Sequence, residues 1–178
     1  MMEMLRLFLG LPVPSECGRE IARFQEDMKT HALRGRFSDV GNLHVTVVFL
    51  GDVEKSFLPV LGRAMHSIRE KAFPISFFRC GSFRKPEGDI VFLDPDETEP
   101  LRSLHAKTVR AVRETGVTFD ERPFRPHLTL GRNVRFQAGY RPQSPSVSFI
   151  CKRLVLFHSH RVNGILTYTP LDFILLSG

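Results

Sequence analysis

The sequence predicts an α+β fold of two pseudo-symmetric lobes, each built from antiparallel strands and helices, around a central cleft. Strand and helix patterns alternate along the chain, yet the consecutive strand pairs at 74–94 and 147–176 favour hairpins over a parallel sheet. A His-x-Thr element also occurs twice, in "NLHVTVVFLG" and in "RPHLTLGR", which indicates one copy in each of two related lobes. Because no long linker or low-complexity segment interrupts the chain, we expect residues 1–178 to form a single bilobal domain.

The first part of the chain is expected to contain five segments. In order they are a strand at 4–13, a helix at 15–30, a polar loop at 31–41, a strand at 42–51 and a helix at 54–72. Ser15 behind Pro14 marks the start of the first helix. The second helix has apolar residues at helical spacing, which requires Pro59 to lie in its first turn.

The second part of the chain adds one more helix and five more strands. In order they are strands at 73–83 and 89–96, a helix at 99–116, and strands at 127–132, 147–159 and 165–176. Thr98 and Pro100 mark the start of this helix, and Gly116 marks its end.

The composition is that of an ordinary globular protein with a sizeable core, with 178 residues of which 42% are hydrophobic and 25% charged. Cys17, Cys80 and Cys151 lie far apart without CxxC spacing, which argues against a disulfide framework or a thiolate zinc site. The apolar start "LRLFLGLPVP" is broken by two prolines, so it predicts a strand and not a signal peptide. No run approaches the roughly 18 apolar residues of a membrane span. We therefore expect a cytoplasmic, monomeric protein that does not bind membranes.

The charge balance is compatible with a phosphate-bearing ligand. The net charge is +6, from 25 lysines and arginines against 19 acidic residues, and 19 of those 25 cations are arginine. A guanidinium group can bind phosphate oxygens with two parallel hydrogen bonds, so the composition favours nucleotides or nucleic acid. An Arg-rich composition can equally reflect solvated surfaces, and charge alone leaves both interpretations open.

The repeated motif places polar side chains on one face of an otherwise apolar strand. Successive strand residues point to opposite faces, so His44 and Thr46 share one face while Val45, Val47 and Phe49 are expected on the other. The apolar face can pack on a helix of the same lobe, which leaves the polar face to line a cleft.

The second copy has the same pattern, with His127 and Thr129 opposite Leu128 and Leu130. From the composition, about 0.06 matches to this pattern are expected by chance, whereas two are present. A single copy would be explained best by a structural histidine bonded to its neighbouring threonine. The matched pair favours a site, because burying two polar pairs without a purpose is costly.

Two imidazoles that face each other across a cleft form an acid–base couple. The ordinary histidine pKa is near 6.5, so one ring can accept a proton near neutral pH while the other donates one. The hydroxyl groups of Thr46 and Thr129 can each donate to a phosphate oxygen. The four residues therefore predict phosphate-ester chemistry that needs no metal.

These motifs resemble those of the 2H phosphoesterase superfamily, and in particular its RNA 2′,3′-cyclic phosphodiesterase branch, historically called 2′-5′ RNA ligases. The resemblance covers nearly the whole chain, from the opening "MLRLFLGLPVP" to the closing "LVLFHSHRVNGILTYTPLDFIL". One departure is Phe37, in a region where many members have Trp, and this change is expected to affect base stacking in the cleft.

The resemblance implies a bilobal 2H phosphoesterase fold with His44 and His127 as catalytic residues, and Thr46 and Thr129 as phosphate-binding residues. The family reaction opens a 2′,3′-cyclic phosphate to a 2′-phosphate without metal or nucleotide cofactor, and members also join RNA ends through 2′-5′ bonds. The implied partners are RNA with 2′,3′-cyclic ends or cyclic nucleotides. We expect His127 to act as the base and His44 as the acid.

Arg132 fits the arginine that follows the second motif in the family and is expected to bind phosphate. Simple alternation from His127 puts Arg132 on the opposite face, unless Gly131 introduces a bulge or ends the strand. Nearby Arg122, Arg125 and Arg135 predict a basic rim around the cleft. The rim is a firmer expectation than the role of any one of these arginines.

Two rival functions remain open from the sequence. A metal-dependent phosphohydrolase would require His158 and His160, an H-x-H pair on one strand face, to join a catalytic histidine at a metal. No third ligand is near them in sequence, so a solvated or edge-strand pair is the better interpretation. A non-catalytic RNA-binding module would keep the basic surface and would show no turnover.

Overall fold

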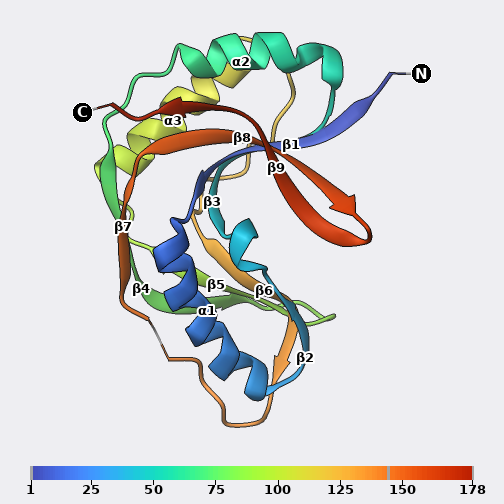
Figure 1. Cartoon of the computed structure of the whole chain (residues 1–178), viewed down its shortest axis with the longest axis vertical. Coiled ribbons are helices and arrows are strands. Elements are labelled where there is room, and N and C mark those ends of the chain that lie inside the picture. Colours follow the sequence, from blue (N-terminus) through green and yellow to red (C-terminus); the bar gives the residue numbers. More distant parts are fainter. Residues whose placement is uncertain (1, 144, 178) are drawn as a thin grey trace.

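The strands of the protein form one strongly curved, nine-stranded sheet in which every pairing is antiparallel (Figure 1). The computed structural model describes residues 2–143 and 145–177. The strand order is β7-β4-β5-β6-β3-β1-β8-β9, and β2 pairs with β6 beside this path. This arrangement confirms the predicted α+β class and excludes a parallel sheet.

One half of the molecule, the upper half in Figure 1, holds four strands and two helices. Its elements are β1 (Met4–Pro12), β3 (His44–Glu54), β8 (Arg153–Val162), β9 (Ile165–Leu175), α2 (Leu58–His66) and α3 (Glu99–Arg113). Helix α3 packs on β3, and α2 packs on β9 and α3. Pro59 lies in the first turn of α2, where its missing N–H costs no hydrogen bond.

The other half holds the remaining five strands and one helix. Its elements are β2 (Ala32–Phe37), β4 (Phe73–Phe83), β5 (Asp89–Pro95), β6 (Leu128–Phe136), β7 (Val147–Cys151) and α1 (Ser15–Thr30). Helix α1 packs against β2 and β7, in the lower half of Figure 1. The chain passes between the halves several times, because β1 is followed by α1, and β7 by β8.

The two halves meet where β3 pairs with β6 through Val45 and Leu128, which are the middle residues of the two His-x-Thr motifs. A local two-fold axis passes between the residues of an antiparallel pair. This axis exchanges His44 with His127 and Thr46 with Thr129. The register of one residue pair therefore gives both motifs equivalent positions on the same face of the sheet.

The side of the sheet opposite the histidines carries the main hydrophobic core. Val45, Leu128 and Leu130 are fully or almost fully buried there, and Leu101 and Leu104 reach the core from α3. Burying such side chains stabilises the fold by about 1.5–3 kcal/mol each. The motif strands are thus fixed from behind by apolar packing.

Three predicted elements differ from the structure. Residues 31–41 were expected to form a loop, but they contain strand β2 and a 3-10 turn at Val40–Asn42, because β6 supplies hydrogen-bond partners for a mostly exposed, polar strand. The expected helix at 54–72 shortens to α2 after a 3-10 turn at Lys55–Phe57. The expected strand at 147–159 divides at Lys152, where the chain leaves β4 and joins β1.

Candidate active site

His44 is held at the start of β3 by its own chain and by aromatic rings. Its Nδ1 lies 2.7 Å from the carbonyl oxygen of Asn42, and its Nε2 lies 3.1 Å from Oγ1 of Thr46. The rings of Phe8 and Tyr168 pack on the imidazole at centroid distances of 4.6 and 5.0 Å. The imidazole is therefore fixed along one edge by hydrogen bonding and on its faces by packing.

His127 repeats this arrangement directly before β6. Its Nδ1 lies 2.8 Å from the carbonyl oxygen of Arg125, again two residues before the histidine. The rings of Phe83 and Phe92 pack on it edge to face, at 5.3 and 5.5 Å. Each lobe thus supplies the same backbone acceptor and its own aromatic pair.

The two backbone contacts fix the tautomer of both rings. A carbonyl oxygen can only accept, so Nδ1 must carry the proton in His44 and in His127. In the neutral ring the lone pair then lies on Nε2. Thr46 donates its hydroxyl proton to Nε2 of neutral His44. Each histidine can accept a proton from a ligand through Nε2, and can return it through the same atom.

Burial lowers the pKa of both histidines. For His44 desolvation lowers the pKa to about 4, against the opposing effect of the Asn42 hydrogen bond, and the charges of His127 and Arg132 lower it further. For His127 desolvation is again the largest cause, opposed by the Arg125 carbonyl, and the charge of Arg132 adds to the lowering. Both rings therefore favour the neutral form, and Arg132 lies close enough to act on both.

A bulge in β3 changes the face on which its later residues lie. Val47 is left out of the pairing with β1, so Val47 and Val48 are both buried in the core. The prediction that Val45 and Val47 oppose His44 is confirmed, whereas the same prediction for Phe49 is wrong. After the bulge Phe49 packs with the aromatic cluster that surrounds His44.

An equivalent bulge in β6 brings Arg132 to the face of the two histidines. Leu130 is left out of the pairing with β5, and Leu130 and Gly131 are both buried. The bulge lies three positions after His127, as the bulge in β3 lies three positions after His44. Arg132 is consequently exposed on the face of the histidines, which is the alternative that the sequence left open at Gly131.

Buried hydrogen bonds hold the β6 bulge. The side-chain amide of Gln25, a buried residue of α1, donates to the carbonyl oxygens of Ser38 and Leu130 at 3.0 and 2.9 Å. The hydroxyl of Ser38 donates to the carbonyl of Thr129 at 2.9 Å. Gln25 and Ser38 thus fix the backbone between Thr129 and Arg132.

The other arginines of the expected rim have different surroundings. Arg122 is ion-paired with Asp120, so it is neutralised. The guanidinium of Arg125 lies over the ring of Phe83, 4.8 Å from its centroid, and so backs the aromatic support of His127. Arg135 is exposed farther along β6. The basic rim stays a prediction for Arg125 and Arg135, and Arg122, which pairs with Asp120, contributes little to it.

Several residues of the site had no signal in the sequence. Asn42 donates from its side chain to the carbonyl of Leu166 at 2.8 Å and accepts from the backbone N–H of Tyr168 at 3.3 Å, which ties the β8–β9 hairpin to His44. Only knowledge that β9 lies beside residues 40–44 could have identified this contact. Phe37, by contrast, packs against the main core, so its expected part in base stacking has no support.

A cavity of about 540 Å³ opens beside His44. It is bounded by the segment around Asn42 on one side and by Phe157, Tyr168 and Phe173 of the β8–β9 hairpin on the other. Apolar and aromatic walls with few polar groups are typical of ligand sites. This cavity can take a planar organic group next to the imidazole.

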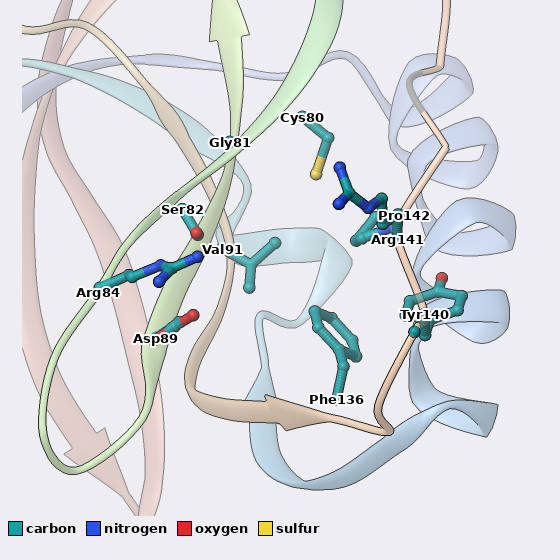
Figure 2. Close-up of a pocket in the computed structure, with 11 residues that line it drawn as sticks. Cys80, Gly81, Ser82, Arg84, Asp89, Val91, Phe136, Tyr140, Arg141 and Pro142 are labelled. Carbon is teal, nitrogen blue, oxygen red and sulfur yellow. The ribbon is translucent and has the colours of Figure 1, made fainter.

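A second cavity, of about 610 Å³, lies behind the sheet of the other half (Figure 2). Cys80, Gly81 and Ser82 all border it. A side chain on Gly81 would point the other way, into the ring of Phe92, which packs on His127, so the side chains of Cys80 and Ser82 lie on the opposite face of β4. Arg84, Asp89 and Tyr140 border the same space in Figure 2. This cavity therefore opens away from the face of the two histidines.

His158 and His160 stack on each other in β8, with ring centroids 4.4 Å apart. Nε2 of His160 lies 2.7 Å from the hydroxyl of Thr169. Within residues 2–143 and 145–177, no group of three or more His, Cys, Asp or Glu side chains is arranged to hold a metal ion. In the same residues no helix is long and apolar enough to span a membrane.

Comparison with known proteins links this geometry to one family. The chain is similar to an RNA 2′,3′-cyclic phosphodiesterase of Escherichia coli (strain K12), with 28% identity over 176 residues that cover 96% of each chain. A protein of the same name from Geobacillus stearothermophilus is 27% identical over 162 residues, which are 86% of this chain. The chain spans about half (52%) of the length of that second relative.

Solved structures share the whole fold. The crystal structure of E. coli LigT complexed with 3′-AMP has a TM-score of 0.85 and 26% identity, covering 99% of this chain and 100% of that chain. LigT in its apo form gives a TM-score of 0.85 at 25% identity, with 99% of both chains covered. Residues 13–163, which include both His-x-Thr motifs, match the sequence model of the 2′-5′ RNA ligase superfamily. The chain belongs to the 2′-5′ RNA ligase superfamily.

Proposed function

We propose that the protein is an RNA 2′,3′-cyclic phosphodiesterase that hydrolyses a 2′,3′-cyclic phosphate to a 2′-phosphate. The observation that carries this proposal is the two-fold relation of His44 and His127, in which each ring keeps its proton on Nδ1 and turns Nε2, which in His44 also contacts the hydroxyl of Thr46, to the shared face. The similar proteins named RNA 2′,3′-cyclic phosphodiesterase support the same reaction.

The phosphate is bound by groups that surround the two histidines. The hydroxyl of Thr129 donates to one of its non-bridging oxygens, and the hydroxyl of Thr46 donates to another once Nε2 of His44 is protonated and no longer accepts from it. Arg132 balances the charge of the phosphate. The position of Arg132 supports this role, since its charge already acts on both imidazoles. The cavity beside His44 receives the nucleoside. RNA ends and free cyclic nucleotides are both substrates on this basis.

The chemical step requires one base and one acid on opposite sides of the phosphorus. Nε2 of His127 takes a proton from water, and the water oxygen forms a new bond to phosphorus. The bond from phosphorus to O3′ breaks, and O3′ receives the proton of Nε2 from His44. The products are a 2′-phosphate and a 3′-hydroxyl, with the two histidines in exchanged protonation states until solvent restores them.

To act as the acid, His44 must be protonated when the substrate is bound. Its low pKa leaves it neutral in the free protein near pH 7. The negative charge of the bound phosphate favours the protonated ring and raises its pKa. Substrate binding therefore favours protonation of His44, so that the ring can act as the acid. The same site joins RNA ends when a 5′-hydroxyl takes the place of water, which forms a 2′-5′ bond.

The proposal needs no metal and no cofactor, since two proton-transfer groups and three phosphate-binding groups complete the reaction. It also treats the two halves as one bilobal domain, residues 1–178, because each half supplies one histidine. We further propose that this domain acts as a monomer in the cytoplasm. Size-exclusion chromatography and cell fractionation test these two points.

The direct test is incubation with a 2′,3′-cyclic nucleotide in excess chelator, followed by ³¹P NMR of the product. We expect a 2′-phosphate at the same rate with and without chelator. A dominant 3′-phosphate product would show that O2′, and not O3′, is the leaving group. Turnover that requires added metal would favour a metal-dependent phosphohydrolase, and binding without turnover would favour an RNA-binding module.

The acid and base are separated by a substrate whose leaving oxygen O3′ is replaced by sulfur. A thiolate leaves without protonation, so His44→Ala should regain most of its lost rate on this substrate, whereas His127→Ala should not. If only His127→Ala regained its rate, His127 would be the acid and His44 the base.

A further inference from the structure

Strands β2 and β6 place four arginines opposite one another in two pairs. Arg34 pairs with Arg135, and Arg36 pairs with Arg132, in the antiparallel pairing of the two strands, with a register shift between the two pairs. We name these four residues the arginine ladder. Like charges directly opposite each other across a strand pair are destabilising. Two such pairs in succession are a cost that a bound anion would remove.

The arginine ladder lies on the face of the sheet that carries the catalytic histidines. Val134 is buried and Phe136 packs against the core, so the exposed Arg135 between them points away from the core. Arg132 also points away from the core, and its charge acts on both histidines. Residues directly opposite in a strand pair share a face, so Arg34 and Arg36 extend the same surface.

Most of this charge has no acidic partner. Among the ion pairs of the described residues, none involves Arg34, Arg36 or Arg132. Arg135 is the one ladder residue that is engaged: it lies 3.7 Å from Asp89, and its guanidinium donates to the carbonyl oxygens of Lys85 and Pro86 at 3.1 and 2.8 Å. The three unneutralised side chains are all exposed. The ladder therefore begins at the catalytic centre with Arg132 and continues outward as a positively charged strip.

We propose that the arginine ladder binds the phosphates that precede the cyclic end of a single-stranded RNA. This inference rests on the proposed function, because the cyclic phosphate must lie between His44 and His127. All other phosphates of such a strand lie on the 5′ side of the reacting nucleotide, so one track leading away from the centre serves them. Arg34 and Arg36 lie two residues apart, about 7 Å along the strand, which fits one extended backbone.

The proposal makes RNA ends better substrates than cyclic mononucleotides. The test compares the wild-type protein with the double variant Arg34→Gln/Arg36→Gln on both substrates. The matched control is Arg63→Gln/Arg110→Gln, which removes two exposed arginines from α2 and α3 in the other half of the molecule. Both double variants change the net charge by the same amount.

We expect the ladder variant to lose about tenfold in kcat/KM on a short RNA with a cyclic end, while hydrolysis of the cyclic mononucleotide stays unchanged. The plot of log kcat/KM against log salt concentration should become shallower by about 1.4, because each neutralised phosphate of a single strand contributes about 0.7. The melting temperature of the ladder variant should equal or exceed that of the wild type, because the repulsion between the paired arginines is relieved. The control variant should match the wild type in all three measurements.

Equal losses in the ladder and control variants, or no loss in either, would overturn the ladder proposal and leave the hydrolysis itself standing. Absence of turnover in the wild type on both substrates would instead overturn the proposed function. In that case fluorescence anisotropy with a labelled, 2′-phosphorylated RNA still tests the ladder. Weaker binding by the ladder variant alone supports it, and equal binding by both variants refutes it.

Discussion

At the scale of single residues, the site depends on which atom of each histidine carries the proton. The carbonyls of Asn42 and Arg125 hold Nδ1–H in the two rings, so Nε2 is the atom left to gain or lose a proton in both. The two rings differ in one respect. Nε2 of His44 accepts a hydrogen bond from Thr46, whereas Thr129 makes no equivalent side-chain bond within the described residues. This asymmetry gives the two threonines different effects on the pH profile.

Replacing either threonine by valine keeps the branched shape and removes the hydroxyl that we propose donates to the phosphate. We expect Thr46→Val and Thr129→Val each to lower kcat/KM by roughly ten- to a hundredfold, since a hydrogen bond to a charged group contributes about 1.5–3 kcal/mol. Steady-state kinetics on a cyclic mononucleotide measures this. Wild-type efficiency in both variants would mean that the threonines only pack.

Thr46→Val should have a second effect, because its hydroxyl contacts Nε2 of His44, the atom that gains and loses the proton. Loss of this contact should displace the His44 limb of the pH profile. Thr129→Val is the matched control and should leave the profile in place. Equal displacement in the two variants would contradict the hydrogen-bond assignment.

At the scale of elements, the two motif strands share a bulge at the same position after the histidine. Gly131 indicated a possible bulge in β6, so the sequence allowed Arg132 to lie on either face of the strand. The bulge in β3 at Val47 had no such sign, because Val47 and Val48 fit an unbroken apolar strand equally well. Simple alternation consequently predicted the face of Phe49 wrongly. Alternation is reliable over the motif itself and fails beyond it.

Gln25 is expected to position Arg132 through the β6 bulge. Gln25→Met is similar in size but cannot donate to the carbonyls of Ser38 and Leu130. We expect it to lower the free energy of unfolding by about 1–3 kcal/mol and to raise KM more than it lowers kcat. Denaturant unfolding and steady-state kinetics measure the two effects. Ser38→Ala is the control for the Thr129 carbonyl bond alone, and unchanged stability and KM in Gln25→Met would remove this role.

At the scale of the whole molecule, local patterns predicted most helices and strands but not how the chain connects the halves. The resemblance carried by the motifs correctly indicated the family, the α+β class and the paired lobes. The sequence predicted one strand at 147–159. In the structure this segment forms β7, which pairs with β4 in one half, and β8, which pairs with β1 in the other half. Strand partners depend on long-range packing, which a local pattern does not contain.

The low pKa of His44 makes the stability of the fold depend on pH. The unfolded chain binds a proton at this residue below about pH 6.5, whereas the folded protein binds it only near pH 4. Stability is therefore complete above pH 6.5 and falls as the pH is lowered to about 4. The contribution is about 3 kcal/mol, at 1.36 kcal/mol per pKa unit.

Chemical denaturation of the wild type and of His44→Asn between pH 4 and pH 7 checks this prediction. The asparagine keeps a polar side chain of similar reach without a titrating ring. We expect the free energy of unfolding to depend less steeply on pH in the variant, because His44 no longer titrates. Some dependence should remain, because other histidines with lowered pKa are still present. Identical slopes would show that His44 is not buried in its neutral form.

The central claim is that His44 and His127 act together as one acid–base pair. Because the productive state has one neutral and one protonated ring, kcat/KM should be bell-shaped against pH, and the lowered pKa of both rings places its maximum below pH 6.5. His44→Ala and His127→Ala should each lower the rate by about 10²–10⁴ and remove one limb of the bell.

The measurement that tests this claim most directly is the pH profile of kcat/KM for the wild type, the two single variants and the double variant. The account predicts that the double variant loses far less than the product of the two single losses, since groups that act as one unit fail with the first deletion. A folded single variant with near wild-type turnover and an unchanged bell would contradict the two-histidine mechanism.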